Sequence, residues 1–245
     1  MPEAEDVLIH AAERATLAVR RMWSGGGGVD RPDPGASIRR IGLWLVACMG
    51  REWPLVPEEA PPPAGWWTAR VRRLAPWQAR PDAVAWSDGT SIHLPRAWLC
   101  DAADPARASA LVAALSLGAR LAAGRRPAAA DRRDAVADLL DAADADRVDH
   151  ALARALPGLR PAIDDLRSTA RRARPAPAAL RPAEAKVEAA VASLLAAPAG
   201  APARRDRTGL RDAEHDRRWA RGLLDGLSRS EREGYRGAAP VAHWG

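Results

Sequence analysis

Acidic residues and histidines at helical spacing are the first candidates for chemistry in this chain. Asp146, Asp149 and His150 fall within one helical turn, and residues 212–216 place two aspartates and a histidine in another. Carboxylate and imidazole groups at such spacing can ligate a divalent metal ion. Both turns also lie among arginines, which pair with acidic residues one turn away on solvated helices. We therefore expect two solvent-exposed salt-bridged faces and predict no metal site.

Other polar residues give equally weak signals for catalysis. His93 has no carboxylate or nucleophile placed beside it in the sequence, so we interpret it as a packed or edge histidine and not a proton carrier. Asp134, Asp138 and Asp141 share one helix face and could bind a cation or a basic partner, but a polar outer face is the interpretation we favour. The chain contains no P-loop, GxGxxG, GxSxG, HExxH or paired CxxC motif. We predict neither an enzyme nor a cofactor.

The aromatic composition predicts a core in which tryptophan replaces phenylalanine. The 245 residues include ten Trp, one Tyr and no Phe. Five of these indoles surround a predicted hairpin, where they form either an indole-rich core or an exposed groove that stacks on a peptide or a base. They are Trp66, Trp67, Trp77, Trp86 and Trp98.

Charge favours an ordinary helical surface over a nucleic-acid interface. The chain has 37 basic and 31 acidic residues, and Lys186 is the only lysine. The arginines are mostly interleaved with Asp and Glu, which is typical of solvated helices. An arginine-rich nucleic-acid-binding regulator nevertheless remains an alternative, because a basic cluster on one face would attract phosphate.

Several features lead us to expect a soluble, cytoplasmic protein. The first residues are acidic where a signal peptide would be basic. The longest apolar run, residues 41–49, is much shorter than the roughly 20 residues that a membrane span needs. Cys48 and Cys100 have no ligand-like spacing, so we interpret them as reduced structural thiols.

A mainly α fold with one small β-hairpin at about residues 83–94 should position these side chains. Asp88-Gly89 predicts a two-residue turn that pairs Ser87 with Thr90 and places Ala85 opposite Ile92. Two strands alone are marginal in water, so helices must cover the hairpin. Residues 53–66 are too rich in proline for a helix and predict an extended segment.

The remaining sequence predicts helices. An amphipathic helix is expected over residues 3–23, and Ser37 could cap a second helix that Gly50 ends. Asp104-Pro105 begins an Ala/Leu helix whose apolar character predicts burial on several sides. Three short helices are expected between residues 131 and 172.

The C-terminal third predicts two long helices separated by a linker. One helix begins at Pro182, residues 196–207 form the linker, and the second helix spans residues 210–227. A capping box, Ser230 to Glu233, then begins a short turn.

We expect three regions: a helical core with the hairpin (1–125), a helical subdomain (126–200), and a linker with a C-terminal helix that leads to a missing or separately encoded domain (201–245). The C-terminal region offers the candidate partner interface, because a terminal indole must find a neighbour or stay exposed. The interface residues we predict are Arg218, Trp219, Tyr235, His243 and Trp244.

Short sequence blocks resemble the N-terminal part of NorD/CbbO-type proteins. The blocks are Gly50-Arg-Glu-Trp-Pro-Leu-Val-Pro57, Pro61-Pro-Pro-Ala-Gly-Trp66, the hairpin Trp86-Ser-Asp-Gly-Thr-Ser-Ile-His-Leu-Pro95, and the closing Tyr235-Arg-Gly and Pro240-Val-Ala-His-Trp-Gly245. Such proteins are accessory proteins of MoxR-type AAA+ ATPases, which activate enzymes such as nitric oxide reductase or rubisco.

The resemblance implies a non-enzymatic adaptor that engages a MoxR-type AAA+ ATPase, a separate von Willebrand factor A (VWA) protein, or both. Family members carry a C-terminal VWA domain with a metal site, whereas this sequence has no DxSxS run. The metal site is therefore not carried over. We expect a split or truncated member of the family.

Overall fold

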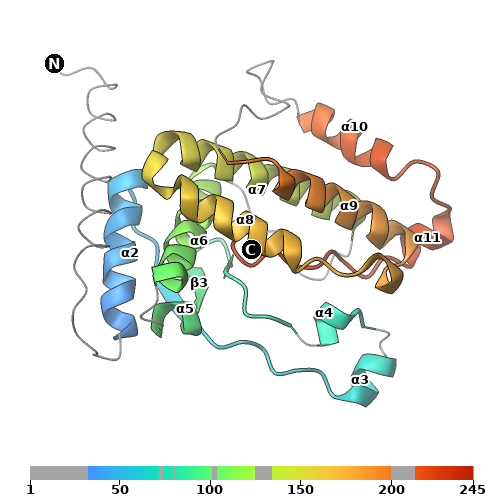
Figure 1. Ribbon diagram of the computed structural model, residues 1–245, viewed down its shortest axis with the longest axis horizontal. Helices are drawn as coiled ribbons and strands as arrows, with labels where there is room; N and C mark the ends of the chain where they lie inside the picture. The colour runs from blue at the N-terminus through green and yellow to red at the C-terminus, as the bar shows by residue number, and fades with distance from the viewer. Residues whose placement is uncertain are drawn as a thin grey trace.

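The computed structural model describes residues 33–71, 74–79, 81–100, 104–124, 134–199 and 213–244. In these residues the chain is mainly α-helical with one small sheet, which confirms the predicted fold class (Figure 1). The helix predicted over residues 3–23 lies outside this part of the chain. The helices are α2 (Pro34–Met49), α3 (Trp66–Val71), α4 (Pro76–Ala79), α5 (Arg96–Cys100), α6 (Asp104–Ala122), α7 (Ala135–Ala155), α8 (Arg160–Arg172), α9 (Pro182–Ala196), α10 (Ala213–Leu223) and α11 (Arg229–Glu233), with short 3-10 turns at Pro157–Leu159 and Pro177–Ala179.

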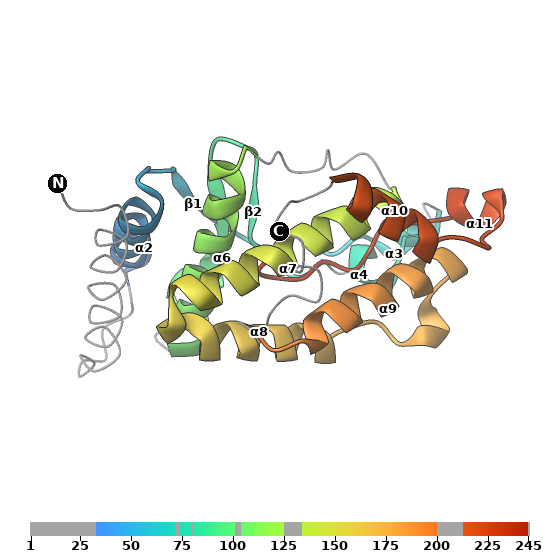
Figure 2. The ribbon, with the colours of Figure 1, turned by 90° about the horizontal axis from the view of Figure 1, so that it is seen from above.

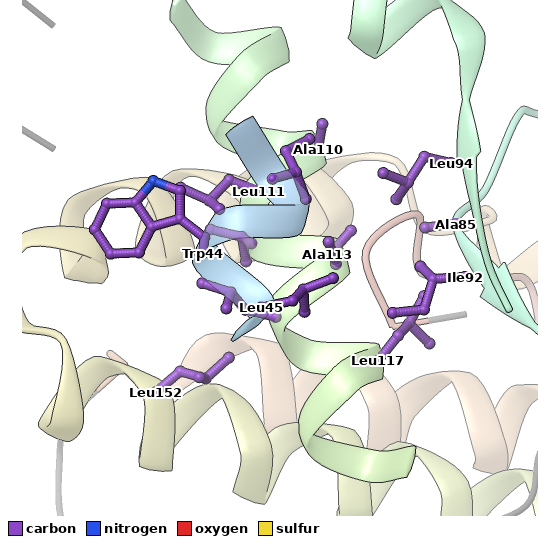
Figure 3. Packing of buried hydrophobic residues seen from close by; sticks show 14 of the residues in the cluster. Trp44, Leu45, Ala85, Ile92, Leu94, Ala110, Leu111, Ala113, Leu117 and Leu152 are labelled. Atoms are coloured by element: carbon purple, nitrogen blue, oxygen red, sulfur yellow. The ribbon is translucent and has the colours of Figure 1, made fainter. Parts of the chain in front are cut away.

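Helix α6 is the centre of the first core, as its apolar sequence predicted. Every residue from Ala110 to Leu117 is buried. Figure 3 shows α2 contributing Trp44 and Leu45 on one side of α6, while Ile92 and Leu94 of the sheet approach from the other. Alanine-rich helix surfaces allow this close approach because they add little side-chain bulk.

Gly118 permits the tightest contact in this core. A Cβ atom at Gly118 would lie 2.7 Å from Cδ2 of Leu45 and 3.6 Å from the ring of Trp53. Leu45 is fully buried and Trp53 is 4% exposed, so neither side chain has free space to move into. Glycine is therefore required by packing and not by backbone conformation at this position.

The sheet has three strands in the order β1-β3-β2, one more than the hairpin alone. Strand β1 (Leu55–Glu58) comes from the proline-rich segment and runs parallel to β3 (Ile92–Pro95). Strand β2 (Trp86–Ser87) pairs antiparallel with β3 on its other side.

The hairpin register differs from the predicted one by two residues. Trp86 pairs with His93 and Ser87 with Ile92, so residues 88–91 form the loop. Asp88 causes the wider loop, because its Oδ1 accepts hydrogen bonds from the backbone N–H groups of Thr90 (2.8 Å) and Ser91 (2.7 Å). A shift of two residues keeps every side chain on its predicted face, and Ala85, Ile92 and Leu94 are buried as expected.

Helix α7 is longer than the sequence predicted. Two of the three short helices expected between residues 131 and 172 are one continuous helix of 21 residues, and the third is α8. The Asp-Ala run at residues 141–146 contains no glycine or proline. Its aspartates pair with arginines of other elements, so the helix continues through it.

Other helix ends also differ from prediction. Asp33, not Ser37, caps α2, and the Ser37 hydroxyl instead donates to the backbone oxygen of Leu99. The capping box that begins α11 uses Ser228 and Glu231 and not Ser230 and Glu233. Gly50 ends α2 in the left-handed conformation, as expected.

Two cores bridge the predicted regions. The first core joins α2, the sheet and α6 to Leu152 of α7 and Ile163 of α8, so residues on both sides of the expected boundary at 125 share it. The second core joins α7, α9 and α10 to residues 235–244, which we name the tail segment. Residues 200–212, which hold most of the predicted linker, lie outside the described residues. No described helix is long and apolar enough to cross a membrane.

We predict that alanine has opposite effects at two helical glycines. Gly42→Ala in α2 should raise the free energy of unfolding by about 0.5–1 kcal/mol, because its Cβ would meet no atom and alanine favours the helix. Gly118→Ala gains the same helix propensity but must displace Leu45, which should make it less stable than Gly42→Ala by about 1–3 kcal/mol. Urea unfolding of both variants tests the difference, and equal effects would show that the contact at Gly118 is not restrictive.

Candidate functional site

The tail segment runs between α7 and α9 toward α6, inside the molecule and not along its surface. Figure 2 shows it passing between the two helices as irregular backbone. Tyr235 is 5%, His243 1% and Trp244 3% exposed. The predicted docking edge at His243 and Trp244 is therefore wrong as a free surface, since both side chains are enclosed by the chain's own helices.

The other predicted interface residues lie on α10. Arg218 is exposed, and Trp219 is half-buried against the second core. Because His243 and Trp244 are buried, they share no exposed surface with Arg218 and Trp219. The structure thus separates the five predicted residues into a buried set of three and a pair on α10.

Asp149 of α7 is the carboxylate around which the buried polar groups gather. Its Oδ2 accepts hydrogen bonds from Nε1 of Trp244 at 2.8 Å and from Nη1 of Arg167 at 2.9 Å. Nε2 of His243 lies 3.3 Å from the same oxygen. Asp149 is fully buried and Arg167 only 1% exposed. The indole N–H of Trp244 therefore has its hydrogen-bond partner inside the fold.

Arg167 joins this carboxylate to the rest of α7 and to α9. Its Nη2 donates to Asp146 at 2.7 Å and also to the backbone oxygen of Leu194. Its guanidinium lies over the ring of Trp244, 5.9 Å from the ring centre. Nε2 of His150 is 3.5 Å from Oδ1 of Asp146. The prediction of a solvated face for Asp146, Asp149 and His150 is therefore wrong, because all three are buried.

The surroundings of Asp149 favour its charged form. Burial alone would raise the pKa of this carboxyl, but the hydrogen bond and charge of His243, the charge of Arg167 and the indole N–H outweigh burial and lower the pKa. Asp149 is therefore a compensated buried anion, and its charge helps to fix the end of the tail.

A second ionic group lies beside the first and links α6 to α7. Arg120 donates to the backbone oxygen of Trp244 at 2.6 Å and pairs with Asp141 and with Asp144. Arg147 then pairs with Asp144 at 3.2 Å and with Asp216 of α10 at 2.7 Å. Asp216, one of the acids at metal-like spacing in the sequence, is thus part of an ion pair.

The beginning of the tail segment is bound by two more carboxyls, those of the half-buried Asp138 and the buried Glu188. Asp138 accepts hydrogen bonds from the Tyr235 hydroxyl and from the backbone N–H of Ala238. Glu188 accepts from the N–H of Ala239 at 2.6 Å, and its other oxygen is 3.4 Å from Nε of Arg174. Burial raises the pKa of Asp138 and of Glu188, while these donors oppose the increase. Asp138 is therefore not on the polar outer face predicted for it.

We name as the cradle the side chains that bind the tail segment or Gly234 directly before it: Gln78, Arg120, Asp138, Asp149, Arg174, Arg181, Glu184 and Glu188. Across the described ranges, no group of three His, Cys, Asp or Glu residues is arranged to hold a metal ion. The arrangement suits recognition of polypeptide backbone, because its arginines offer donors to carbonyls and its carboxyls offer acceptors to N–H groups.

The outer face of the sheet is a second, exposed candidate site. Val56, His93 and Trp86 pair directly across the three strands, so they form one row on the same face. The His93 ring stacks on the indole with centroids 3.9 Å apart and planes 11° apart. Glu58 lies 3.3 Å from Nδ1 of His93 and accepts the indole N–H, and Asp88 lies 3.5 Å from Nε2. His93 therefore has two carboxylates beside it, contrary to the prediction.

The sequence contained a signal for the buried charged side chains, which the prediction missed. Arg167 continues the inward stripe of α8, one turn after the buried Ile163. Glu184 and Glu188 likewise share the buried face of α9 with Val191. A charged residue inside an apolar helical stripe predicts a buried ion pair, although its partner cannot be identified from local spacing.

No family model, curated protein or solved structure matches this chain. The site must therefore be interpreted from its own geometry.

We predict that removing the charge of Arg167 is strongly destabilising. Arg167→Met should lower the free energy of unfolding by about 3–5 kcal/mol, since it leaves Asp149 and Asp146 without their cation. Arg172→Met on the same helix is the matched control, because Arg172 is exposed and binds Ser168 and Thr169 of its own helix at the surface, and it should change stability by less than about 0.5 kcal/mol. Similar losses in urea unfolding would contradict the proposed role of Arg167.

We predict an acid-dependent loss of stability that depends on Asp149. Its folded pKa lies below the unfolded value of about 4, so its contribution is complete above that value and is lost as the pH falls toward the folded pKa. Between about pH 5 and pH 3, the unfolding free energy of the wild type should decrease more steeply than that of Asp149→Asn. Asp165→Asn, at an exposed position of α8, controls for loss of one charge. Parallel pH profiles for wild type and Asp149→Asn would reject this role.

Proposed function

We propose that this chain is a non-enzymatic adaptor of the NorD/CbbO kind for a MoxR-type AAA+ ATPase, and that it binds its partner through the outer face of the sheet. One observation carries the choice of surface. Trp86 is 37% exposed, yet its ring is stacked on His93 and its N–H is bound by Glu58. A fixed, exposed indole can bind with little loss of side-chain entropy, and tryptophan is enriched among the residues that dominate interface energy.

The arrangement of the resembling sequence blocks supports this proposal. Two blocks that are far apart in the sequence meet at the sheet, where the Ile92 N–H donates to the backbone oxygen of Pro54 at 2.9 Å. Ala85, which directly precedes the hairpin block, donates its N–H to the backbone oxygen of Ala242 in the closing block at 3.0 Å. The segments on which the resemblance depends therefore belong to one structural unit, and Trp86 lies within it.

The chemistry of the outer face indicates the surface it would recognise. The row from Val56 to Trp86 is apolar and aromatic, and Glu58 and Asp88 place two carboxylates at its border. Hydrogen bonds from the backbone of Ser91 and Thr90 lower the pKa of Asp88, so it stays ionised. A partner surface with basic side chains around an apolar centre would be complementary. The ATPase, or a separately encoded VWA protein that acts with it, would provide this surface.

We predict that Trp86→Ala weakens binding to a MoxR-type AAA+ ATPase, measured by calorimetry with purified proteins. The dissociation constant should rise tenfold or more, which is about 1.4 kcal/mol or above. Trp67→Ala is the matched control, because it removes an indole that is 63% exposed on α3 and outside the sheet. Circular dichroism should confirm that both variants keep their helices.

If Trp67→Ala weakens binding of the ATPase as much as Trp86→Ala does, the outer face of the sheet is not the docking surface. Absence of binding by the wild type to both the ATPase and the VWA protein would reject the adaptor proposal. If nucleic acid binds instead, with an affinity that falls steeply with salt, the arginine-rich regulator would replace the adaptor.

A further inference from the structure

The cradle binds the tail segment through both its backbone and its side chains. Side chains from several helices and loops reach backbone N–H or C=O groups of the tail segment and of Gly234, which directly precedes it. The side chains that do so are Gln78, Arg120, Asp138, Arg174, Arg181 and Glu188. Arg174 donates to two consecutive carbonyl oxygens, those of Ala239 at 2.8 Å and Pro240 at 3.0 Å. Backbone recognition of this kind gives affinity that depends little on sequence.

Side chains near both ends of the segment supply specificity. Tyr235 donates its hydroxyl to Asp138, and eight and nine residues later His243 and Trp244 meet Asp149. Between them Arg236 pairs with Glu184 at 2.6 Å, and Val241 is buried in the second core. The site therefore combines contacts to a tyrosine at one end of the segment with contacts to His-Trp at the other.

In the described part of the chain, no backbone hydrogen bond joins α6, α7, α8 or α9 to the tail segment. The tail segment lies outside every helix and strand, and one sheet-like backbone bond, from Ala85 to Ala242, joins it to the hairpin. Helix α7 packs directly on α6, α8 and α9. Release of the tail would thus remove side-chain contacts while leaving each helix complete.

An emptied cradle would stay open to a new ligand. Asp138 and Arg174 are half-buried and Glu188 is buried. Release of the tail would take the Tyr235 and Ala238 donors from Asp138 and the Ala239 N–H from Glu188, so water or another peptide must replace these hydrogen bonds. The groove would fill with water and keep its donors and acceptors. The segment that leads into it is exposed at Asp225, Gly226 and Ser228.

We infer that the cradle is a peptide-binding site, with the tail segment as its built-in ligand, and that it accepts the same segment in trans from a second copy of this chain. This inference is independent of the proposed adaptor function, which concerns the outer face of the sheet. The ligand class is a peptide with tyrosine followed at eight and nine positions by His-Trp. In the intact chain the tethered tail competes at an effective concentration in the millimolar range, so a free peptide enters only when the tail is weakened or detached.

Full-length Trp244→Ala provides the first test, because it weakens the tail and leaves the cradle side chains unchanged. A fluorescent peptide of residues 228–245 should bind this variant saturably, at least about tenfold more tightly than it binds the wild-type chain. The same peptide with Trp244→Ala should bind about tenfold or more weakly, and a scrambled peptide should not bind. The bound peptide should also raise the melting temperature of the variant. A folded, monomeric variant that shows no saturable binding would overturn the inference.

A cleavable chain provides the second test and does not rely on a destabilised variant. A site-specific protease sequence inserted after Gly226, whose Cβ position is open, allows the tail to be cut after folding. The cut tail should remain bound during gel filtration and exchange with the labelled peptide, while the helical circular dichroism signal is retained. A tail that never exchanges, or loss of helix on exchange, would show that residues 235–244 are an ordinary part of the core.

Discussion

Compensation of one buried carboxylate, Asp149, is the constraint on which the arrangement of the helices and the tail depends. An enclosed anion without donors would cost several kcal/mol, so the chain must bring donors to it. They come from α8, through Arg167, and from the tail, through His243 and Trp244. Because Arg167 also binds α9 at the backbone of Leu194, one set of polar contacts fixes the positions of α7, α8, α9 and the tail together.

The two cores use different means to achieve a unique packing. Around α6 the fit is steric, and an alanine-rich helix with one obligatory glycine accepts Leu45 on one side and the sheet on the other. Around the tail the fit is electrostatic, with carboxyls and guanidinium groups that pair in specific combinations. Apolar contacts tolerate small shifts, whereas directional hydrogen bonds specify a register. The polar core is thus suited to hold a segment that has no regular secondary structure of its own.

Local patterns in the sequence predicted most of the helices and strands. They failed where contacts between residues far apart in the sequence determine the structure. The mainly α fold, the position of the hairpin, the inward faces of Ala85 and Ile92, and the burial of α6 all followed from composition and periodicity. The hairpin register did not, because the hydrogen bonds of Asp88 within its own loop outweighed the turn preference. The cradle did not either, because Arg167 and Asp149 are 18 residues apart and Trp244 and Asp149 are 95 apart, beyond the reach of any helical period. Asp146 and Asp149, whose spacing suited metal ligands or solvated ion pairs, are instead the acidic partners of Arg167 in a buried ionic network.

The position of Pro57 in β1 has a consequence for association. The Ile92 N–H donates to the backbone oxygen of Pro54, and in a parallel pair every second residue faces the neighbouring strand. Leu55 and Pro57 therefore direct their backbone groups away from β3. Proline lacks the N–H that a further strand would need, and on the opposite side of the sheet Ala242 lies against the residue that precedes β2. Both borders of this small sheet therefore resist extension, and copies of the chain at high concentration are protected from fibre-like growth through it.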